Sequence, residues 1–178
     1  PILGESMLDM LYPTASKEDE FEEKIHKTNY TQPLLFSYEY SLARLWQHWG
    51  VEPDALIGHS MGEIVAATIS GLFTLEQALS LVFHRGKLMT ERCKTGAMLS
   101  ITLSEKTIAD ILEQLELNEQ ISVAAVNTHE NTVVAGDSKS INLLKEYLDK
   151  LDCECKDLAI SHAFHSPMSV DMIPEFED

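Results

Sequence analysis

A five-residue turn motif, Gly58-His59-Ser60-Met61-Gly62, holds the residue best suited to chemistry. It has the form Gly-x-Ser-x-Gly, in which the glycines allow a strained turn that pushes the serine hydroxyl outward. The apolar residues 54–57 before it predict a buried strand, and residues 63–70 after it predict a helix that ends at Gly71. A serine in this context can act as a nucleophile, and the free N–H groups at the helix start can hold a developing oxyanion. The alternative is a chance pentapeptide in an ordinary turn.

A serine hydroxyl needs a base to become a useful nucleophile, and imidazole titrates in the required range. Among the seven histidines, His165 is the best candidate because it lies in a short loop after a predicted strand and before Pro167. His162 competes with it, and a surface histidine without a role is the alternative. His59, directly before the serine, could line the same site or merely pack.

Arg85 is the next residue with chemical potential. It follows the apolar residues Leu81-Val82-Phe83 in the predicted helix after the serine helix, so its guanidinium is expected to be paired. A guanidinium can bind a carboxylate through two parallel hydrogen bonds. From position alone, the favoured alternative is an internal ion pair with one of the 29 acidic residues.

Helical patterns dominate the first half of the chain, where these residues must be positioned. Residues 16–27 predict an exposed helix with Ser16 and Asp19 as a possible N-terminal cap. Residues 31–49 predict a long helix with apolar side chains at helical spacing. Thr74 and Gln77 form a capping box that starts the helix carrying Arg85.

The pattern changes after Gly96. Strands are predicted at 97–102, 121–126, 132–135 and 155–160, and helices at 104–115 and 138–151. This β-α-β-β-α-β order is that of a ferredoxin-like unit. The predicted fold is therefore α/β, with residues 1–95 as part of a core that contains Ser60, residues 96–160 as a small ferredoxin-like subdomain, and residues 161–178 as a return to the core with His165.

Composition excludes several classes of function. With 44% hydrophobic residues the chain is globular, and its net charge of −16 argues against nucleic acid or anionic membrane as a partner. No apolar run is long enough to span a bilayer, and no secretory signal is visible. The three cysteines, Cys93, Cys153 and Cys155, form neither a disulfide framework nor a zinc site. They fit a reducing cytoplasm, and no metal site is expected.

Taken together, the motifs resemble the acyltransferase domain of modular polyketide synthases and the malonyl-CoA:acyl carrier protein transacylases. Gly58 to Glu63 matches the nucleophile motif of that family. Residues 83–89 are similar to its arginine segment, and residues 31–36, 45–46 and 49–54 are similar to the approach to the serine. His162-Ala163-Phe164-His165-Ser166-Pro167 matches the downstream histidine motif. The resemblance covers nearly the whole chain and implies an α/β-hydrolase-like core, incomplete here, with the ferredoxin-like subdomain inserted.

The resemblance also implies a reaction. Ser60, deprotonated by His165, would attack the thioester of malonyl-CoA, with the Met61 N–H as one oxyanion donor and Arg85 on the free malonyl carboxylate. The acyl group would then pass to the phosphopantetheine thiol of an acyl carrier protein, in ping-pong fashion and without a bound cofactor. His162 and Phe164, with His59, would set specificity, since the His-Ala-Phe-His form is associated with malonyl rather than methylmalonyl.

Two departures from the family are visible. No segment matches the family's Gly-Gln-Gly-Ser-Gln sequence, which supplies a core strand and a second oxyanion donor, and the family continues past the histidine motif. The chain is therefore expected to be an interior piece of a domain in a multidomain synthase, weakly active or inactive alone. Two rivals stay open: a serine hydrolase such as a thioesterase, for which Asp137 is a poorly placed triad acid, and a non-catalytic acyltransferase-like scaffold.

Overall fold

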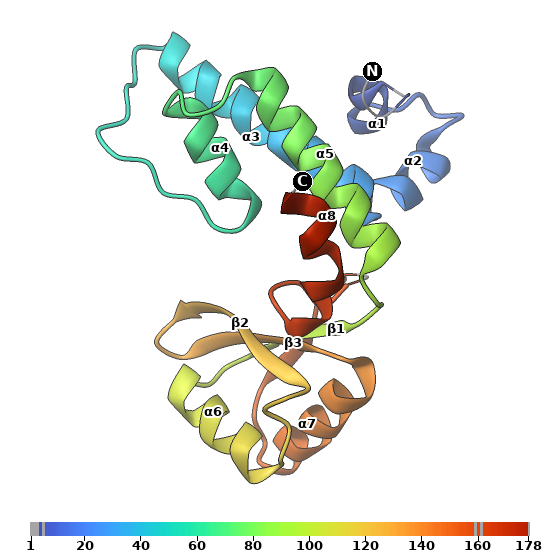
Figure 1. The fold of residues 1–178 in the computed structure, drawn as a ribbon, viewed down its shortest axis with the longest axis vertical. Helices are drawn as coiled ribbons and strands as arrows, with labels where there is room; N and C mark the ends of the chain where they lie inside the picture. The colour runs from blue at the N-terminus through green and yellow to red at the C-terminus, as the bar shows by residue number, and fades with distance from the viewer. Residues whose placement is uncertain (1–3, 5, 159, 161, 178) are drawn as a thin grey trace. The chain divides into compact units, whose positions relative to one another are not determined.

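The computed structural model describes residues 4, 6–158, 160 and 162–177. The chain forms two compact units, residues 1–90 and residues 91–178 (Figure 1). The first unit is helical and the second holds a small antiparallel sheet, so the fold is mixed α/β.

Unit 1 consists of α1 (Met7–Leu11), α2 (Glu18–Ile25), α3 (Thr28–His48), α4 (Met61–Ile69) and most of α5 (Leu75–Arg92). The capping box predicted for α5 is confirmed: the Thr74 N–H donates to Gln77 Oε1 at 2.9 Å, and the Gln77 N–H donates to Thr74 Oγ1 at 3.2 Å. The cap predicted for α2 is wrong, because Lys17 occupies its N-cap position without a side-chain bond. The Ser16 hydroxyl instead shares a hydrogen bond with Thr14.

One core of unit 1 lies where α4 and α5 pack against α3, and a second, smaller one joins α1 and α2 to α3. The buried side chains of the first core are Phe36, Met61, Val65, Ala78 and Val82. Only the first half of α3 is buried in this way. Six other apolar side chains along α3 and at its end are 40–62% exposed, namely Leu35, Tyr38, Leu42, Leu45, Trp46 and Trp49.

The buried strand predicted at residues 54–57 is wrong, because this segment is an exposed loop in which the Ile57 side chain is 98% accessible. A strand needs a neighbour to satisfy its backbone N–H and C=O groups. None of the described residues of unit 1 forms a strand, so the segment has no edge to pair with.

Unit 2 contains β1 (Ala97–Ile101), α6 (Glu105–Gln114), β2 (Ile121–Thr128), β3 (Asn131–Gly136), α7 (Ser138–Lys150) and β4 (Cys155–Asp157). The strands form one antiparallel sheet in the order β2-β3-β1-β4. The predicted cap of α6 is confirmed by the Thr107 N–H, which donates to Ser104 Oγ at 3.2 Å. The last strand ends earlier than predicted, although Leu158 N–H still bonds Met98 O at 3.0 Å; Ala159 is outside the described residues.

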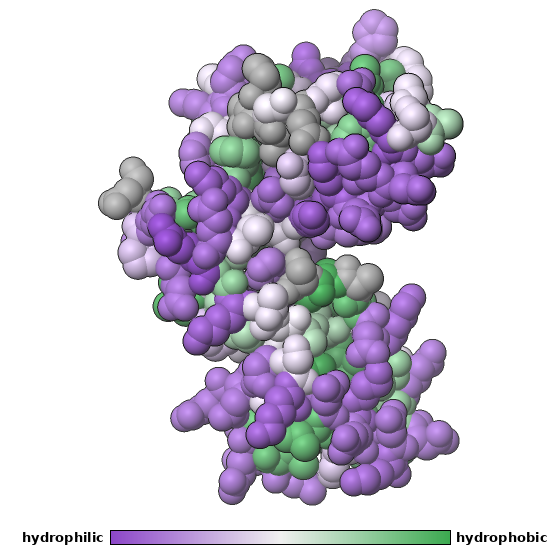
Figure 2. Space-filling model, turned by 90° about the vertical axis from the view of Figure 1, so that its right-hand side faces the viewer, coloured by the Kyte–Doolittle hydropathy of each residue, from purple (hydrophilic) through white to green (hydrophobic). Residues whose placement is uncertain are grey.

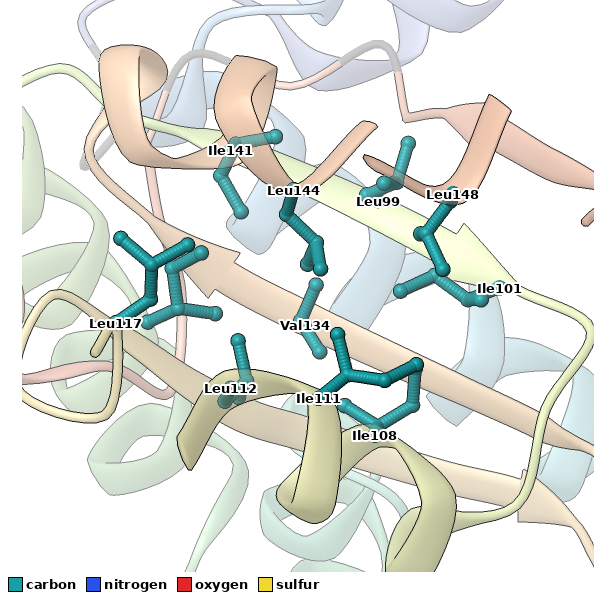
Figure 3. Packing of buried hydrophobic residues seen from close by; sticks show 11 residues of the cluster. Leu99, Ile101, Ile108, Ile111, Leu112, Leu117, Val134, Ile141, Leu144 and Leu148 are labelled. Carbon is teal, nitrogen blue, oxygen red and sulfur yellow. The ribbon is translucent and has the colours of Figure 1, made fainter. Parts of the chain in front are cut away.

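Both faces of this sheet are covered. Alternate residues point to opposite faces, so Leu99, Ile101 and Val134 meet α6 and α7 on one side (Figure 3). Met98, Val133 and Ala135 meet Ala163 on the other side. The chain then ends in a 3-10 helix, η1 (Pro167–Met172), and α8 (Ile173–Glu177). Residues 162–165, which carry the histidine motif, thus adjoin the apolar cluster on this second face of the unit 2 sheet.

Candidate active site

Ser60 lies at the turn into α4, in a conformation that few serines adopt. Its φ is 54° and its ψ −116°, and a positive φ in a residue with a Cβ is strained. Gly58 makes this turn possible, because a Cβ there would lie 2.2 Å from the carbonyl carbon and oxygen of Gly62. The side chain of Ser60 is half-buried. The backbone thus has the geometry of the strained turn predicted for a nucleophilic serine.

The turn after Ser60 has its own backbone hydrogen bonds. The Gly62 N–H donates to His59 O at 2.9 Å, and the Glu63 N–H donates to Ser60 O at 3.1 Å. Met61 is the first residue of α4, where an N–H has no partner within its helix. Its side chain is buried in the unit 1 core and fixes the start of the helix. The Met61 N–H is therefore available by geometry to a negative group beside Ser60, while the His59 side chain is exposed.

Arg85 lies on α5, half-buried against α3. Its Nη1 donates to Oε1 of the buried Gln32 at 2.6 Å. Burial lowers the pKa of Arg85, yet a guanidinium stays charged in proteins. Within the described residues of unit 1, no carboxylate pairs with it, so the internal ion pair considered from the sequence is not found there.

The histidine motif lies in unit 2. His162 is buried and forms a backbone bridge with Thr95, and its ring lies 6.3 Å from that of Phe164. Burial lowers the pKa of His162, because the charged imidazole would lose its hydration. His165 is exposed in a turn and has a φ of 57°, so this candidate base, like Ser60, has a positive φ. The Ser166 hydroxyl closes this turn on Ala163 O at 2.7 Å.

The predicted residues are thus divided between the units. Ser60, Met61, His59 and Arg85 belong to unit 1, and His162, Phe164 and His165 belong to unit 2. Among the described residues, no group of three His, Cys, Asp or Glu side chains could hold a metal ion. None of the described helices has both the length and the apolar character to cross a membrane.

A model of the acyl transferase domain matches residues 4–177 of this chain. The chain belongs to the acyl transferase domain family. Relatives of this family include the PKS-NRPS hybrid synthetase acdB of Aspergillus candidus, 39% identical over 93% of the chain. Polyketide synthase GfsA of Streptomyces halstedii is 36% identical over 98% of the chain. The chain spans only 6% and 2% of these two relatives.

Solved structures of acyl transferases agree with this assignment. The acyltransferase domain from the second module of the salinomycin polyketide synthase has a TM-score of 0.86 and 34% identity, covering 98% of this chain and 40% of its own. The malonyl CoA-acyl carrier protein transacylase of Burkholderia pseudomallei has a TM-score of 0.83 and 29% identity, covering 98% of this chain and 58% of its own. The resemblance inferred from the motifs is confirmed.

Gln32, the hydrogen-bond partner of Arg85, was not predicted from the sequence. The residue was visible in the segment similar to the family, Thr31-Gln32-Pro33, but a polar residue near a predicted helix start is usually solvated. The one hint in the sequence was that Gln32 directly precedes the apolar residues Pro33, Leu34 and Leu35 of the long helix. Which side of α3 would meet α5 could not be read from that pattern, because it depends on contacts 53 residues apart.

Proposed function

We propose that the chain is part of a malonyltransferase that transfers the malonyl group of malonyl-CoA to an acyl carrier protein. The observation that carries the proposal is Ser60, which combines a Gly-x-Ser-x-Gly sequence, a positive φ and a place before α4 in a chain of the acyl transferase family. A strained backbone at such a turn is typical of a nucleophile rather than of a structural serine.

In the proposed reaction, Ser60 Oγ attacks the thioester carbonyl carbon while the imidazole of His165 takes the hydroxyl proton. Backbone N–H groups, that of Met61 among them, hold the tetrahedral oxyanion. The C–S bond then breaks and coenzyme A leaves as a thiol with the proton from His165. A phosphopantetheine thiol attacks the acyl-serine ester in the same way, which restores Ser60 and predicts ping-pong kinetics.

Arg85 is the proposed partner of the free carboxylate of the malonyl group. Its half-buried position and neutral partner Gln32 support this role, because the guanidinium charge is not used by an acid of the described part of unit 1. A plain acyl group would leave this cation unpaired, at a cost of about 1–3 kcal/mol. No bound cofactor or metal takes part in the proposed chemistry.

Phe164, with His162 and His59, is proposed to set the preference for malonyl over methylmalonyl. The half-buried Phe164 side chain packs against the apolar cluster of Met98, Val133, Ala135 and Ala163, and its ring centroid lies 6.3 Å from that of His162. One added methyl group in an apolar pocket changes binding by about 1–3 kcal/mol. Competition between malonyl-CoA and methylmalonyl-CoA for Ser60 measures this preference, and equal labelling by both would refute it.

The finer fold assignment is part of the same proposal. The order of elements in unit 2 and its β2-β3-β1-β4 sheet support a ferredoxin-like subdomain at residues 96–160. Residues 1–95 and 161–178 are proposed to contribute to an α/β-hydrolase-like core. Acyl carrier protein and neighbouring synthase domains are the proposed partners, in a cytoplasm that keeps the free thiols of Cys93, Cys153 and Cys155 reduced.

Intact mass spectrometry after mixing with malonyl-CoA tests the proposal, with Ser60→Ala as the control. A single malonyl adduct that disappears in Ser60→Ala is the expected result. An adduct that is lost to water faster than it passes to a thiol would point to a hydrolase instead. Failure to gain any acyl mass, both by this chain and by the longer synthase of which it is expected to be a piece, would favour a non-catalytic scaffold.

A further inference from the structure

Gln32 is a buried polar residue with two specific contacts at the crossing of α3 and α5. Its Oε1 accepts a hydrogen bond from Arg85 Nη1 at 2.6 Å, and its Nε2 donates to Met89 Sδ at 3.1 Å. Because arginine can only donate, the oxygen of the amide must face Arg85 and the nitrogen must face the sulfur. Both ends of the amide are therefore committed, which fixes its orientation.

Gly86 brings the two helices close enough for these contacts. A Cβ at this position would lie 3.1 Å from Thr28 O and 3.2 Å from the Asn29 Cα, both of which are backbone atoms. The backbone of α5 thus approaches the first turn of α3 without an intervening side chain. Arg85 directly precedes Gly86, and its guanidinium lies within hydrogen-bond distance of Gln32 at this crossing.

The partner of Arg85 in unit 1 is neutral, whereas Arg92 in unit 2 has an acidic partner. Arg92 Nη2 binds the carboxylate of Glu175 at 2.7 Å on the surface, so its charge is compensated. Gln32 orders the guanidinium of Arg85 but leaves its charge uncompensated. A glutamate at position 32 would instead neutralise Arg85, and it would place a second acceptor oxygen against the Met89 sulfur, where Gln32 now donates.

We propose that Gln32 is a positioning residue that orients Arg85 toward an acyl group with a free carboxylate, and that its neutrality makes this selection possible. The inference rests on the proposed malonyl transfer, because it names the residue through which Arg85 selects its substrate. Gln32 supplies geometry to the guanidinium, and the substrate supplies the negative charge.

Two substitutions in the full chain separate these tasks. Gln32→Glu keeps an acceptor on Arg85 but adds a negative charge, and Gln32→Met keeps the volume but removes the acceptor. The measured quantity is kcat/KM for acylation of Ser60 by malonyl-CoA and by acetyl-CoA, which lacks the free carboxylate. We expect the malonyl-to-acetyl ratio to fall about 10- to 100-fold in Gln32→Glu, mainly through the malonyl KM, and about tenfold in Gln32→Met.

Gln47→Glu is the matched control. Gln47 lies on the same helix, and its Oε1 accepts from Arg44 Nη1 at 2.9 Å on the surface. It therefore repeats the same change of charge beside an arginine that has no proposed substrate role, and the ratio should stay at the wild-type value. A role of Gln32 in packing alone would slow acylation by both CoA esters equally. Equal slowing, or an unchanged ratio in both Gln32 variants, would overturn the inference.

A second measurement does not need turnover. Phenylglyoxal modifies exposed guanidinium groups, and peptide mass spectrometry reports the modification of Arg85. We expect malonate to protect Arg85 in the wild-type protein and not in Gln32→Glu. Absence of acylation by either ester would refute the proposed malonyl transfer, but the protection experiment would still decide the role of Gln32. Equal protection of Arg85 in the wild-type protein and in Gln32→Glu would rule out the positioning role of Gln32.

Discussion

Gly58 and Gly62 flank Ser60 symmetrically in the sequence, but their surroundings differ. A Cβ at Gly58 would lie 2.2 Å from the Gly62 carbonyl carbon and oxygen and 2.3 Å from the Glu63 nitrogen. These are backbone atoms of the turn itself and cannot move away without changing the conformation of Ser60. The nearest atom to a Cβ at Gly62 is Glu39 Oε2 at 3.7 Å, which is an ordinary contact.

Gly58→Ala should therefore abolish the reactivity of Ser60, while Gly62→Ala should retain it. Alanine is also preferred over glycine within a helix, so Gly62→Ala should keep or raise stability by up to about 1 kcal/mol. Labelling of Ser60 by a fluorophosphonate probe, together with urea unfolding of both variants, measures the two effects. Wild-type labelling of Gly58→Ala would show that the turn does not depend on the missing Cβ.

The buried imidazole of His162 should make the stability of the fold depend on pH. Its buried position lowers the pKa of the imidazole in the folded chain, whereas in the unfolded chain the pKa is about 6.5. Below that pH the unfolded state binds more protons than the folded state, so protonation favours unfolding. The contribution of His162 should be fully present above about pH 7 and should be lost progressively as the pH falls through 6.5.

Urea unfolding between pH 8 and pH 5 measures this dependence. His162→Phe should flatten the decline relative to the wild-type protein, because the buried proton acceptor is gone. His129→Asn removes an exposed histidine from the turn after β2 and should leave the decline unchanged. An equal decline in the wild-type protein and His162→Phe would contradict the prediction.

At the scale of elements, local signals decided what the sequence could predict. The capping box before α5 and the Ser104 cap of α6 are formed by residues three apart, and both were readable without knowing the fold. The strands predicted for unit 2 are present in the structure, because each finds its pairing partner within the same unit. The strand prediction for residues 54–57 was wrong because a strand needs a neighbouring strand to pair with, and the described residues of unit 1 form none.

The candidate site follows the same rule. The strained turn at Ser60 was predictable, since the glycine positions and the following helix are local. The Arg85 partner was not, because the contact between Gln32 and Arg85 depends on how α3 and α5 pack. The sequence offered 29 acids as partners, and the structure instead selects an amide. Long-range packing is therefore the information that a single sequence did not contain.

The cap of α5 offers a test at this scale, because this helix carries Arg85. Thr74→Ala removes the hydroxyl that accepts from the Gln77 N–H, so this exposed half of the capping box is lost. We expect a loss of about 1 kcal/mol in the free energy of unfolding, with Thr74→Ser close to the wild-type value. Urea denaturation measures the change. A loss below about 0.3 kcal/mol would mean that the box contributes little to α5.

The whole molecule carries far more acids than bases. Lysine and arginine number 13 and aspartate and glutamate 29, which gives the net charge of −16. Hydrophilic residues cover most of the face seen in Figure 2, as expected of so charged a chain. The ion pairs formed on the surface are few beside this surplus and are each worth at most about 1 kcal/mol. Those within the described part of the chain include Lys24–Glu20, Arg92–Glu175 and Lys145–Asp157.

Repulsion among the surplus acids should therefore outweigh the surface pairs, and salt should stabilise the chain. Raising NaCl from about 10 mM to about 150 mM shortens the Debye length from about 30 Å to about 8 Å, which screens the repulsion over most of the surface. We expect the melting temperature to rise by a few degrees. The double substitution Glu22→Gln and Glu23→Gln on the exposed side of α2 should raise the melting temperature at low salt and reduce its dependence on NaCl. Both acids lie after the first turn of α2, so their loss removes repulsion without removing the favourable interaction that acids of the first turn make with the helix dipole. A melting temperature that falls with NaCl would mean that the ion pairs, rather than the net charge, control the stability of the chain.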